Sequence, residues 1–297
     1  MIAIGAPDIR FVIGIDGGGT ATRARLTYAS GALLANAEAG PSALGQGVDQ
    51  AWTNVLCAID RAFEAARLRD WRYDECAVGL GLAGAIVETH RQKFLDVARR
   101  FPRLALASDG FTALLGAHRG GPGVVVAAGT GSIGEALLAD GAHVSIGGWG
   151  YPVGDEGSGA WLGMHAMRHA QQVVDRRTAA GPLARAIHAA AGSTRDALLS
   201  WCERAGQNAY AALAPFVFET ERSDPFSAEL LDRAARALDD LATTLDPAGD
   251  LPLVVSGSIG VRLHPRLAPR VRARLVEPHG DALDGALQLI RRELDAR

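Results

Sequence analysis

The apolar positions along the chain fall into short continuous runs and into stretches with helical spacing. The run from Phe11 to Ile15 is typical of a buried strand and ends in a cluster of glycines. Between residues 50 and 66, apolar side chains recur on one side of a helix, which predicts an amphipathic helix. Further strands are predicted at residues 22–28, 32–37, 76–82, 104–107 and 253–256, and further helices at 89–100, 111–118 and 281–294.

One arrangement of elements occurs twice. The apolar residues Val124 to Ala128 enter a Gly/Thr loop, an apolar stretch follows, and the turn Asp140-Gly141 comes next, as in residues 11–37. The two copies lie about 110 residues apart, which indicates a duplicated fold, since repeat arrays have periods of about 20 to 50 residues. Residues 164–245 are predicted to be mostly helical. Strands that alternate with helices favour an α/β fold with mixed sheets.

Composition narrows the class of protein. The chain has 297 residues, enough for two domains, and its 30 basic and 33 acidic residues favour neither nucleic acid nor a membrane surface as a partner. Its single lysine, Lys93, excludes a P-loop, which needs a Gly-Lys-Ser/Thr sequence. Cys57, Cys76 and Cys202 have no paired spacing, and no apolar run approaches the roughly 20 residues that span a bilayer. We expect a cytoplasmic globular protein.

The loop after the first strand is the strongest candidate for chemistry. The consecutive Gly17, Gly18 and Gly19 allow backbone N–H groups to face an anion, and Thr20 and Thr22 can add hydroxyl donors. Asp16, at the end of a buried strand, is suited to hold Mg²⁺ through water. The plain alternative is a hairpin turn with a capping aspartate, although two residues would suffice for such a turn.

The sequence Gly129-Thr130-Gly131-Ser132-Ile133-Gly134 follows a strand and matches G-x-G-x-x-G. Asp155 lies about 20 residues beyond, where a dinucleotide-binding fold has its ribose-binding acid. However, only residues 135–139 separate this motif from the Asp140-Gly141 turn, and a crossover helix needs more residues. A second phosphate-binding hairpin fits this length better.

Three further junctions carry candidate residues. In the glycine-rich segment 147–159, the acids Asp155 and Glu156 lie beside aromatic residues, a combination typical of sugar sites. Alternatively, these acids could cap a helix that begins near residue 160. Asp109 follows a strand and precedes a helix, where it is either an active-site acid or an N-cap. Gly257 and Ser258 form a strand-to-glycine junction suited to face a nucleotide base or ribose.

In this order, these segments resemble the BadF/BadG/BcrA/BcrD family of the actin/hexokinase/Hsp70 ATPase superfamily, which includes N-acetylglucosamine and glucosamine kinases. The resemblance covers roughly residues 11–289. It implies an α/β fold of two duplicated actin-like (ribonuclease H-like) ATPase domains, with mixed sheets flanked by helices. The first would span residues 1–119 and 283–297, and the second residues 120–282.

The resemblance also implies an ATP-dependent kinase that uses Mg²⁺ and phosphorylates the 6-hydroxyl of N-acetylglucosamine or glucosamine. Asp109 would be the general base, and Asp16 would hold the metal. The phosphate hairpins would comprise Asp16, Gly17, Gly18, Gly19, Thr20 and Thr22 in the first and Gly129, Thr130, Gly131 and Ser132 in the second, with Gly257 and Ser258 facing the adenosine. The sugar would contact Ser42, Asp109, Gly148, Trp149, Gly150 and Asp155. Many relatives carry an asparagine for the sugar where this chain reads Gly40-Pro41-Ser42.

Two other functions stay open. The same family includes ATPases that activate dehydratases through an iron–sulfur cluster, which commonly needs four cysteines, and a third possibility is an ATP- and sugar-binding sensor without turnover. We also expect a homodimer that forms through the helical region 164–245, because its alanine-rich helices exceed what the core fold needs.

Overall fold

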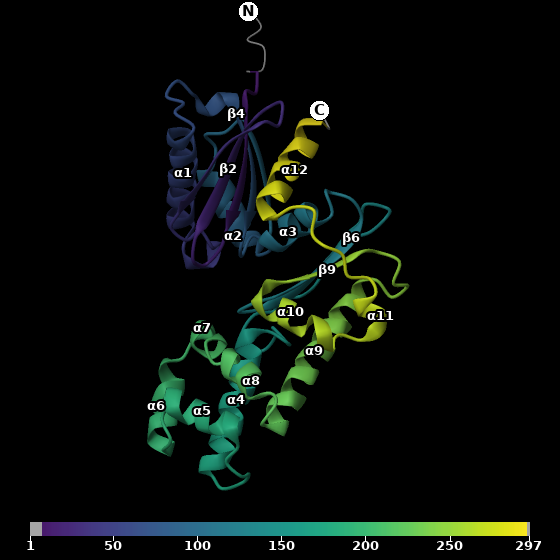
Figure 1. Ribbon diagram of the computed structural model, residues 1–297. Coiled ribbons are helices and arrows are strands. Elements are labelled where there is room, and N and C mark those ends of the chain that lie inside the picture. Colours follow the sequence, from purple (N-terminus) through teal and green to yellow (C-terminus); the bar gives the residue numbers. More distant parts are fainter. Residues whose placement is uncertain (1–7, 296–297) are drawn as a thin grey trace, which may run out of the picture. The chain divides into compact units, whose positions relative to one another are not determined.

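Each copy of the duplicated strand pattern forms a mixed sheet of its own. The computed structural model describes residues 8–295 (Figure 1), and the chain divides into two units. Unit 1 comprises Met1–Gly121 and Glu277–Arg297, and unit 2 comprises Pro122–Val276.

The sheet of unit 1 has five strands in the order β3-β2-β1-β4-β5. Their bounds are β1 (Phe11–Gly17), β2 (Thr22–Tyr28), β3 (Leu33–Ala39), β4 (Cys76–Leu82) and β5 (Arg103–Ala107). The first three strands form an antiparallel meander, whereas β4 pairs in parallel with β1 and with β5. The carboxyl ends of β1, β4 and β5 therefore lie at one edge of the sheet, where ligands bind in open α/β sheets.

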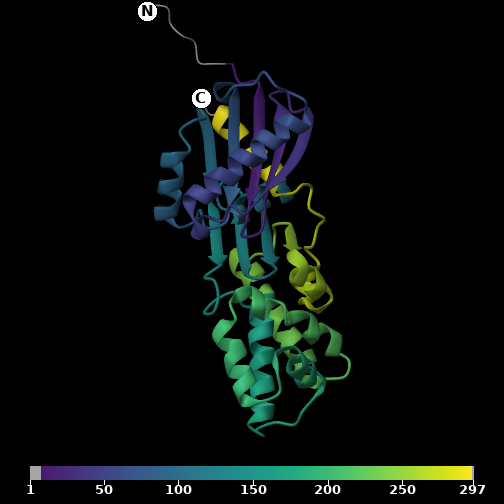
Figure 2. The same ribbon diagram turned by 90° about the vertical axis from the view of Figure 1, so that its left-hand side faces the viewer.

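Helices cover both faces of this sheet. They are α1 (Val48–Ala65), α2 (Glu88–Val97), α3 (Asp109–Ala117) and α12 (Ala282–Asp295). Both ribbon views place α1 and α12 on opposite faces (Figures 1 and 2). Gly14 and Gly79 allow α12 to lie directly on the sheet, since a Cβ atom at either position would meet the helix backbone. The chain's last helix thus completes unit 1.

The sheet of unit 2 repeats the meander with one parallel partner, in the order β8-β7-β6-β9. Its strands are β6 (Gly123–Ala128), β7 (Ser132–Leu137), β8 (His143–Gly147) and β9 (Leu253–Ser256). Its helices are α4 (Gly159–Val174), α5 (Pro182–Ala191), α6 (Arg195–Arg204), α7 (Gln207–Ala211), α8 (Ala214–Thr220), α9 (Pro225–Leu245), α10 (Gly257–Leu263) and α11 (Pro269–Arg272). Helices α9 and α10 pack on the sheet, and α4 to α8 form a helical layer that shares the same apolar core.

The predicted α/β fold with duplicated mixed sheets is confirmed, and the strand 253–256 has the predicted bounds. Two proposed helix caps are wrong. Ser108, not Asp109, caps α3 by accepting from the backbone N–H of Phe111 at 3.1 Å. Ser158, not the Asp155-Glu156 pair, caps α4. Within residues 8–295, no helix combines the length and the apolar character needed to cross a membrane.

Candidate active site

The first glycine loop, Gly18–Ala21, joins β1 to β2 and is held by hydrogen bonds from a neighbouring segment. The backbone N–H groups of Ser42 and Ala43 donate to the Gly18 carbonyl at 3.0 and 3.1 Å. Thr22 is fully buried, and its hydroxyl lies 2.6 Å from the Gly40 carbonyl oxygen and 2.7 Å from the Ser42 Oγ. A Cβ atom at Gly18 would meet nothing within 4 Å, so the loop presents open backbone at this position. These contacts bring Ser42, which the sequence analysis assigned to the sugar, next to the first glycine loop.

Asp16 has a partner that the sequence analysis did not identify. It lies opposite Arg23 in the antiparallel pair of β1 and β2, and Arg23 donates to the Asp16 Oδ2 through Nε at 3.0 Å and through Nη2. The hydrogen bond to Asp16 raises the pKa of Arg23. Both bonds end on Oδ2, so the Oδ1 atom faces neither Arg23 nitrogen.

Asp109 is the first residue of α3 and follows β5 at the carboxyl edge of the parallel strands. The Ala107 position of β5 pairs with Gly81 of β4, which in turn pairs with Asp16 of β1. Asp109 therefore lies at the same sheet edge as Asp16, two strands away. Its side chain is exposed, and the cap of α3 is supplied by Ser108. Because Ser108 caps the helix, a capping role does not account for the aspartate at position 109.

The second glycine loop, Gly129–Gly131, joins β6 to β7 and packs against the start of α4. The backbone N–H groups of Gly159 and Ala160 donate to the carbonyls of Gly129 and Thr130 at 2.8 and 3.1 Å. The Ser132 hydroxyl donates to the Glu156 carbonyl at 2.8 Å. The loop is therefore tied to the glycine-rich segment that precedes α4.

Asp155 is buried in unit 2 beside this loop. Its exposed fraction is 4%, its φ is +62°, and its Oδ1 accepts from the Ser132 backbone N–H at 3.3 Å. The Oδ2 atom accepts from the Gln207 amide at 2.8 Å. Burial raises the pKa of Asp155, the backbone bonds from Ser132 and Gly150 lower it, and the charge of Glu156 raises it further.

The segment between β8 and α4 presents Trp149 to solvent. The Trp149 side chain is 85% exposed, whereas Gly154 is buried beneath it and donates through its backbone N–H to the Gly150 carbonyl at 2.8 Å. Gly148 and Gly150 have φ of +65° and +79°, conformations that glycine adopts without strain. An exposed indole on a segment fixed in this way is available to pack on the apolar face of a ligand.

Gly257 and Ser258 begin α10 directly after β9, and both are exposed. Gly257 has a φ of +83°, and a Cβ atom there would clash with the Ala128 carbonyl at the end of β6. The glycine therefore lets the start of α10 lie against the strand that leads into the second glycine loop.

Unit 1 thus brings together the first glycine loop and Ser42, with Asp109 at the same sheet edge. Unit 2 brings together the second loop, Asp155, the Gly148–Gly150 segment and Gly257. Arg23 and Gln207 were not among the predicted site residues, although they bond the two candidate carboxylates Asp16 and Asp155. An arginine opposite an aspartate across a hairpin is a signal that strand register could have supplied. Gln207 lies 52 residues from its partner and carries no such signal.

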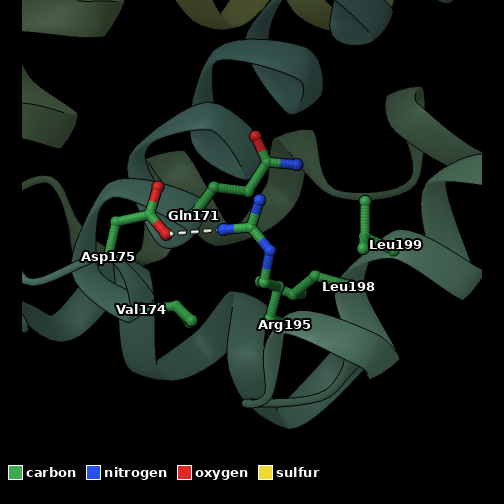
Figure 3. A pocket seen from close by; sticks show the side chains of 6 residues that line it. All are labelled: Gln171, Val174, Asp175, Arg195, Leu198 and Leu199. Atoms are coloured by element: carbon green, nitrogen blue, oxygen red, sulfur yellow. Dashed lines mark hydrogen bonds and ion pairs between the residues drawn. The ribbon is translucent and has the colours of Figure 1, made fainter.

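A separate pocket lies between the end of α4 and the start of α6 (Figure 3). Arg195 bridges it by donating to Asp175 at 3.0 Å, and the side chain of Leu199 is half exposed at its wall. The remaining lining residues are Gln171, Val174 and Leu198. No sequence motif pointed to this pocket, and both charged groups are used in their mutual ion pair.

The three cysteines lie in different elements. Cys57 is in α1, Cys76 is the buried first residue of β4, and Cys202 is in α6, and each is a free thiol. Burial raises the pKa of Cys76 to about 12. In the part of the chain that the structure describes, no three His, Cys, Asp or Glu side chains are grouped to hold a metal ion.

Two mixed sheets, each with a glycine hairpin and a parallel partner strand, define the class of actin-like ATPases. The same fold occurs in the ROK hexokinase of Thermus thermophilus, which is 18% identical with a TM-score of 0.59, over 96% of this chain and 99% of that chain. Much greater similarity is found to the crystal structure of a candidate N-acetylglucosamine kinase of Chromobacterium violaceum. That chain is 46% identical with a TM-score of 0.91, over 96% of this chain and 100% of that chain.

The sequence comparisons narrow the class to one family. Residues 13–259 match the model of the BadF/BadG/BcrA/BcrD ATPase family. The chain is also 32% identical over 280 residues to the glucosamine kinase GspK of Vibrio cholerae, which covers 94% of this chain and 95% of that protein. The protein belongs to the BadF/BadG/BcrA/BcrD ATPase family.

Proposed function

We propose that this protein is an ATP-dependent amino-sugar kinase that transfers the γ-phosphate of ATP to the 6-hydroxyl of N-acetylglucosamine or glucosamine. The observation that carries the proposal is the position of Asp109. Its carboxylate is exposed at the carboxyl edge of the parallel strands, while Ser108 supplies the helix cap. The similarity to a glucosamine kinase over nearly the full length of both chains supports the amino-sugar substrate.

In the proposed reaction, Asp109 accepts the proton of the sugar 6-hydroxyl as that oxygen attacks the γ-phosphorus. The bond between the γ-phosphorus and the bridging oxygen breaks, and ADP leaves with the bond's electron pair. The proton then passes from Asp109 to water. Phosphoryl transfer depends mainly on positioning and on charge stabilisation. The exposed backbone of the two glycine loops, at Gly18–Thr20 and Gly129–Gly131, would supply N–H donors to the phosphates.

The residues present fit a magnesium ion held mainly by the substrate. Mg²⁺ in such sites keeps several waters and takes one or two carboxylates besides the phosphates. Asp16 offers its Oδ1 atom, because Arg23 bonds only the Oδ2 atom. When bound with ATP, the ion would neutralise charge on the phosphates. Arg23, in turn, fixes the orientation of the Asp16 carboxylate.

We assign the sugar contacts to Ser42, Gly148, Trp149, Gly150 and Asp155. The exposed Trp149 ring would pack on the apolar face of the sugar, and a carboxylate accepts bonds from hydroxyl groups. The adenosine would contact Gly257 and Ser258. A homodimer formed through residues 164–245 and a cytoplasmic location complete the proposal.

The test compares Asp109→Asn with Asp16→Asn in an assay of ADP release, with N-acetylglucosamine, glucosamine, glucose or no sugar. Asp109→Asn is expected to lower sugar-dependent turnover by about 10²- to 10⁴-fold, the usual contribution of positioned proton transfer. Sugar and ATP binding and the melting temperature should change little, because Ser108 keeps its cap. Asp16→Asn should also weaken the magnesium-dependent part of nucleotide binding.

Two results would contradict these assignments. Normal turnover by Asp109→Asn would remove its role as the general base. If no sugar raised ADP release by the wild-type protein above the no-sugar rate, the kinase assignment itself would be wrong, and a sensor or an activator ATPase would replace it.

A further inference from the structure

The carboxylate of Asp155 is bonded from three different segments of unit 2. The backbone N–H of Ser132 donates from the second glycine loop, and the backbone N–H of Gly150 donates from the segment that carries Trp149. The Gln207 side-chain amide donates from α7 at 2.8 Å. A carboxylate has about four acceptor sites, so one remains for a ligand.

We propose that Gln207 is a positioning residue for the sugar site. Gln207 holds the Asp155 carboxylate in the one orientation in which the remaining acceptor site of that carboxylate points to a sugar hydroxyl. This inference rests on the proposed function. The two backbone donors belong to glycine-rich loops, whereas the Gln207 donor belongs to a helix. Gln207 therefore ties the carboxylate to the helical layer of unit 2.

Helix α7 is itself firmly anchored. Gly163 of α4 has no side chain because the Tyr210 carbonyl of α7 occupies that space. The Tyr210 ring lies 5.4 Å from the Tyr151 ring and 5.1 Å from the Trp201 ring, measured between centroids. Tyr151 belongs to the same glycine-rich segment as Trp149, so α7 contacts this segment at two places, Asp155 and Tyr151. A helix fixed in this way can position the residues that it contacts.

The geometry also explains why an amide is placed here. A carboxyl group at position 207 would put two acids within hydrogen-bonding distance, and two neighbouring carboxylates resist ionising together. A neutral donor favours the charged form of Asp155, which accepts bonds from all sides. The charge of Glu156 acts on Asp155 directly. In α7, Tyr210 interacts with the titratable groups Cys202 and Tyr151, and burial raises the pKa of Tyr210. Tyr210 therefore stays uncharged near neutral pH.

The test uses three variants of the full-length protein: Gln207→Ala, Gln207→Glu and, as the matched control, Asn208→Ala at the exposed neighbouring position of α7. Gln207→Ala is expected to raise the KM for the amino sugar roughly 10-fold, the effect of losing one bond to a charged group, and to leave the KM for ATP nearly unchanged. Amide hydrogen exchange in residues 148–154 should become faster even without sugar. Asn208→Ala should match the wild type in both measurements.

Gln207→Glu separates positioning from a purely structural role through its pH profile. At acidic pH, one shared proton keeps a hydrogen bond between the two carboxyl groups, and sugar binding is retained. At alkaline pH both groups ionise and repel, so kcat/KM for the sugar relative to wild type should fall by about 10-fold or more between pH 6 and pH 8.5. Asn208→Ala should not show this loss relative to the wild type.

The outcomes are distinct. A wild-type protein with sugar-dependent turnover, together with unchanged sugar KM in both Gln207 variants, would overturn this inference and leave the proposed function standing. Faster exchange without any change in KM would also overturn it, since Gln207 would then serve stability alone. Absence of sugar-dependent turnover in the wild type would overturn the proposed function and this inference together.

Discussion

Substitution of Thr22 by valine tests how the first glycine loop is held. The two side chains have the same shape, but valine lacks the hydroxyl that lies between the Gly40 carbonyl and the Ser42 Oγ. A hydroxyl has one hydrogen, and a carbonyl can only accept. The Thr22 hydroxyl is the donor in both contacts and shares its hydrogen between the Gly40 carbonyl and the Ser42 Oγ, so its removal leaves both groups without that partner.

The expected cost follows from burial. Thr22 and Ser42 are each 0% exposed, so water cannot replace the lost bonds without rearrangement of the loop. Leaving a buried polar group unpaired costs about 1 to 3 kcal/mol, and we expect about 2 to 3 kcal/mol in total because the Ser42 hydroxyl can rotate. For domains of this size 1 kcal/mol corresponds to roughly 3 °C, so the melting temperature should fall by roughly 6 to 9 °C. The KM for ATP should rise as well, because the loop loses its fixed shape.

The measurement is thermal unfolding of Thr22→Val, Ser42→Ala and the double variant. Both single substitutions break the same Thr22–Ser42 bond, so the double variant should be destabilised by about 1 kcal/mol less than the sum of the single effects. Additive effects within about 0.3 kcal/mol would refute this Thr22–Ser42 hydrogen bond, as would a Thr22→Val protein that melts within about 2 °C of the wild type.

Two further substitutions probe unit 2. In Gly131→Ala, the added Cβ would lie 2.8 Å from the Asp155 Oδ2. We therefore expect kcat/KM for ATP to fall by about 10-fold or more. An alanine variant with wild-type kinetics would contradict this and show that the loop relaxes freely. Burial and the charge of Arg233 lower the pKa of His165, whereas its bond to the Trp161 carbonyl raises it. The folded state thus binds a proton less readily than the unfolded state, and stability should fall as pH drops below about 6.5. The urea concentration at the midpoint of unfolding should depend less on pH between 7.5 and 5.5 in His165→Gln than in the wild type. The same pH dependence in both proteins would contradict this account.

Local features of the chain predicted much of the fold. Apolar runs that end in glycines marked both hairpins, because a buried strand and its tight turn are encoded by adjacent residues. The repeated order of strands then indicated two sheets of the same design. Residue pairs brought together only by tertiary packing could not be predicted in this way. Gln207 meets Asp155 across 52 residues through the docking of α7, and no periodicity reports that contact.

The helix caps show a different kind of limit. Asp109 and Asp155 were considered as N-caps because aspartate is common at that position. Ser108 and Ser158 are equally good caps at neighbouring positions. Sequence preference alone does not decide between adjacent candidates, since the cap depends on which residue adopts the extended backbone that precedes the helix. Both serines do so, with ψ of 153° and 175°. The two aspartates are thereby available for other roles.

The two glycine hairpins share one design but are held by different chemistry. The loop of the first is held by the hydroxyl groups of Thr22 and Ser42 and by backbone bonds, with the ion pair of Asp16 and Arg23 at the base of the hairpin. The second is held by the buried carboxylate of Asp155, whose pKa is raised by its burial. Asp155 therefore takes up a proton at a higher pH than an exposed aspartate does, and a protonated carboxyl group has fewer acceptor sites for the Ser132 and Gly150 donors. Acidification should therefore loosen the second hairpin, and this loosening gives unit 2 a contribution of its own to the acid sensitivity of nucleotide binding.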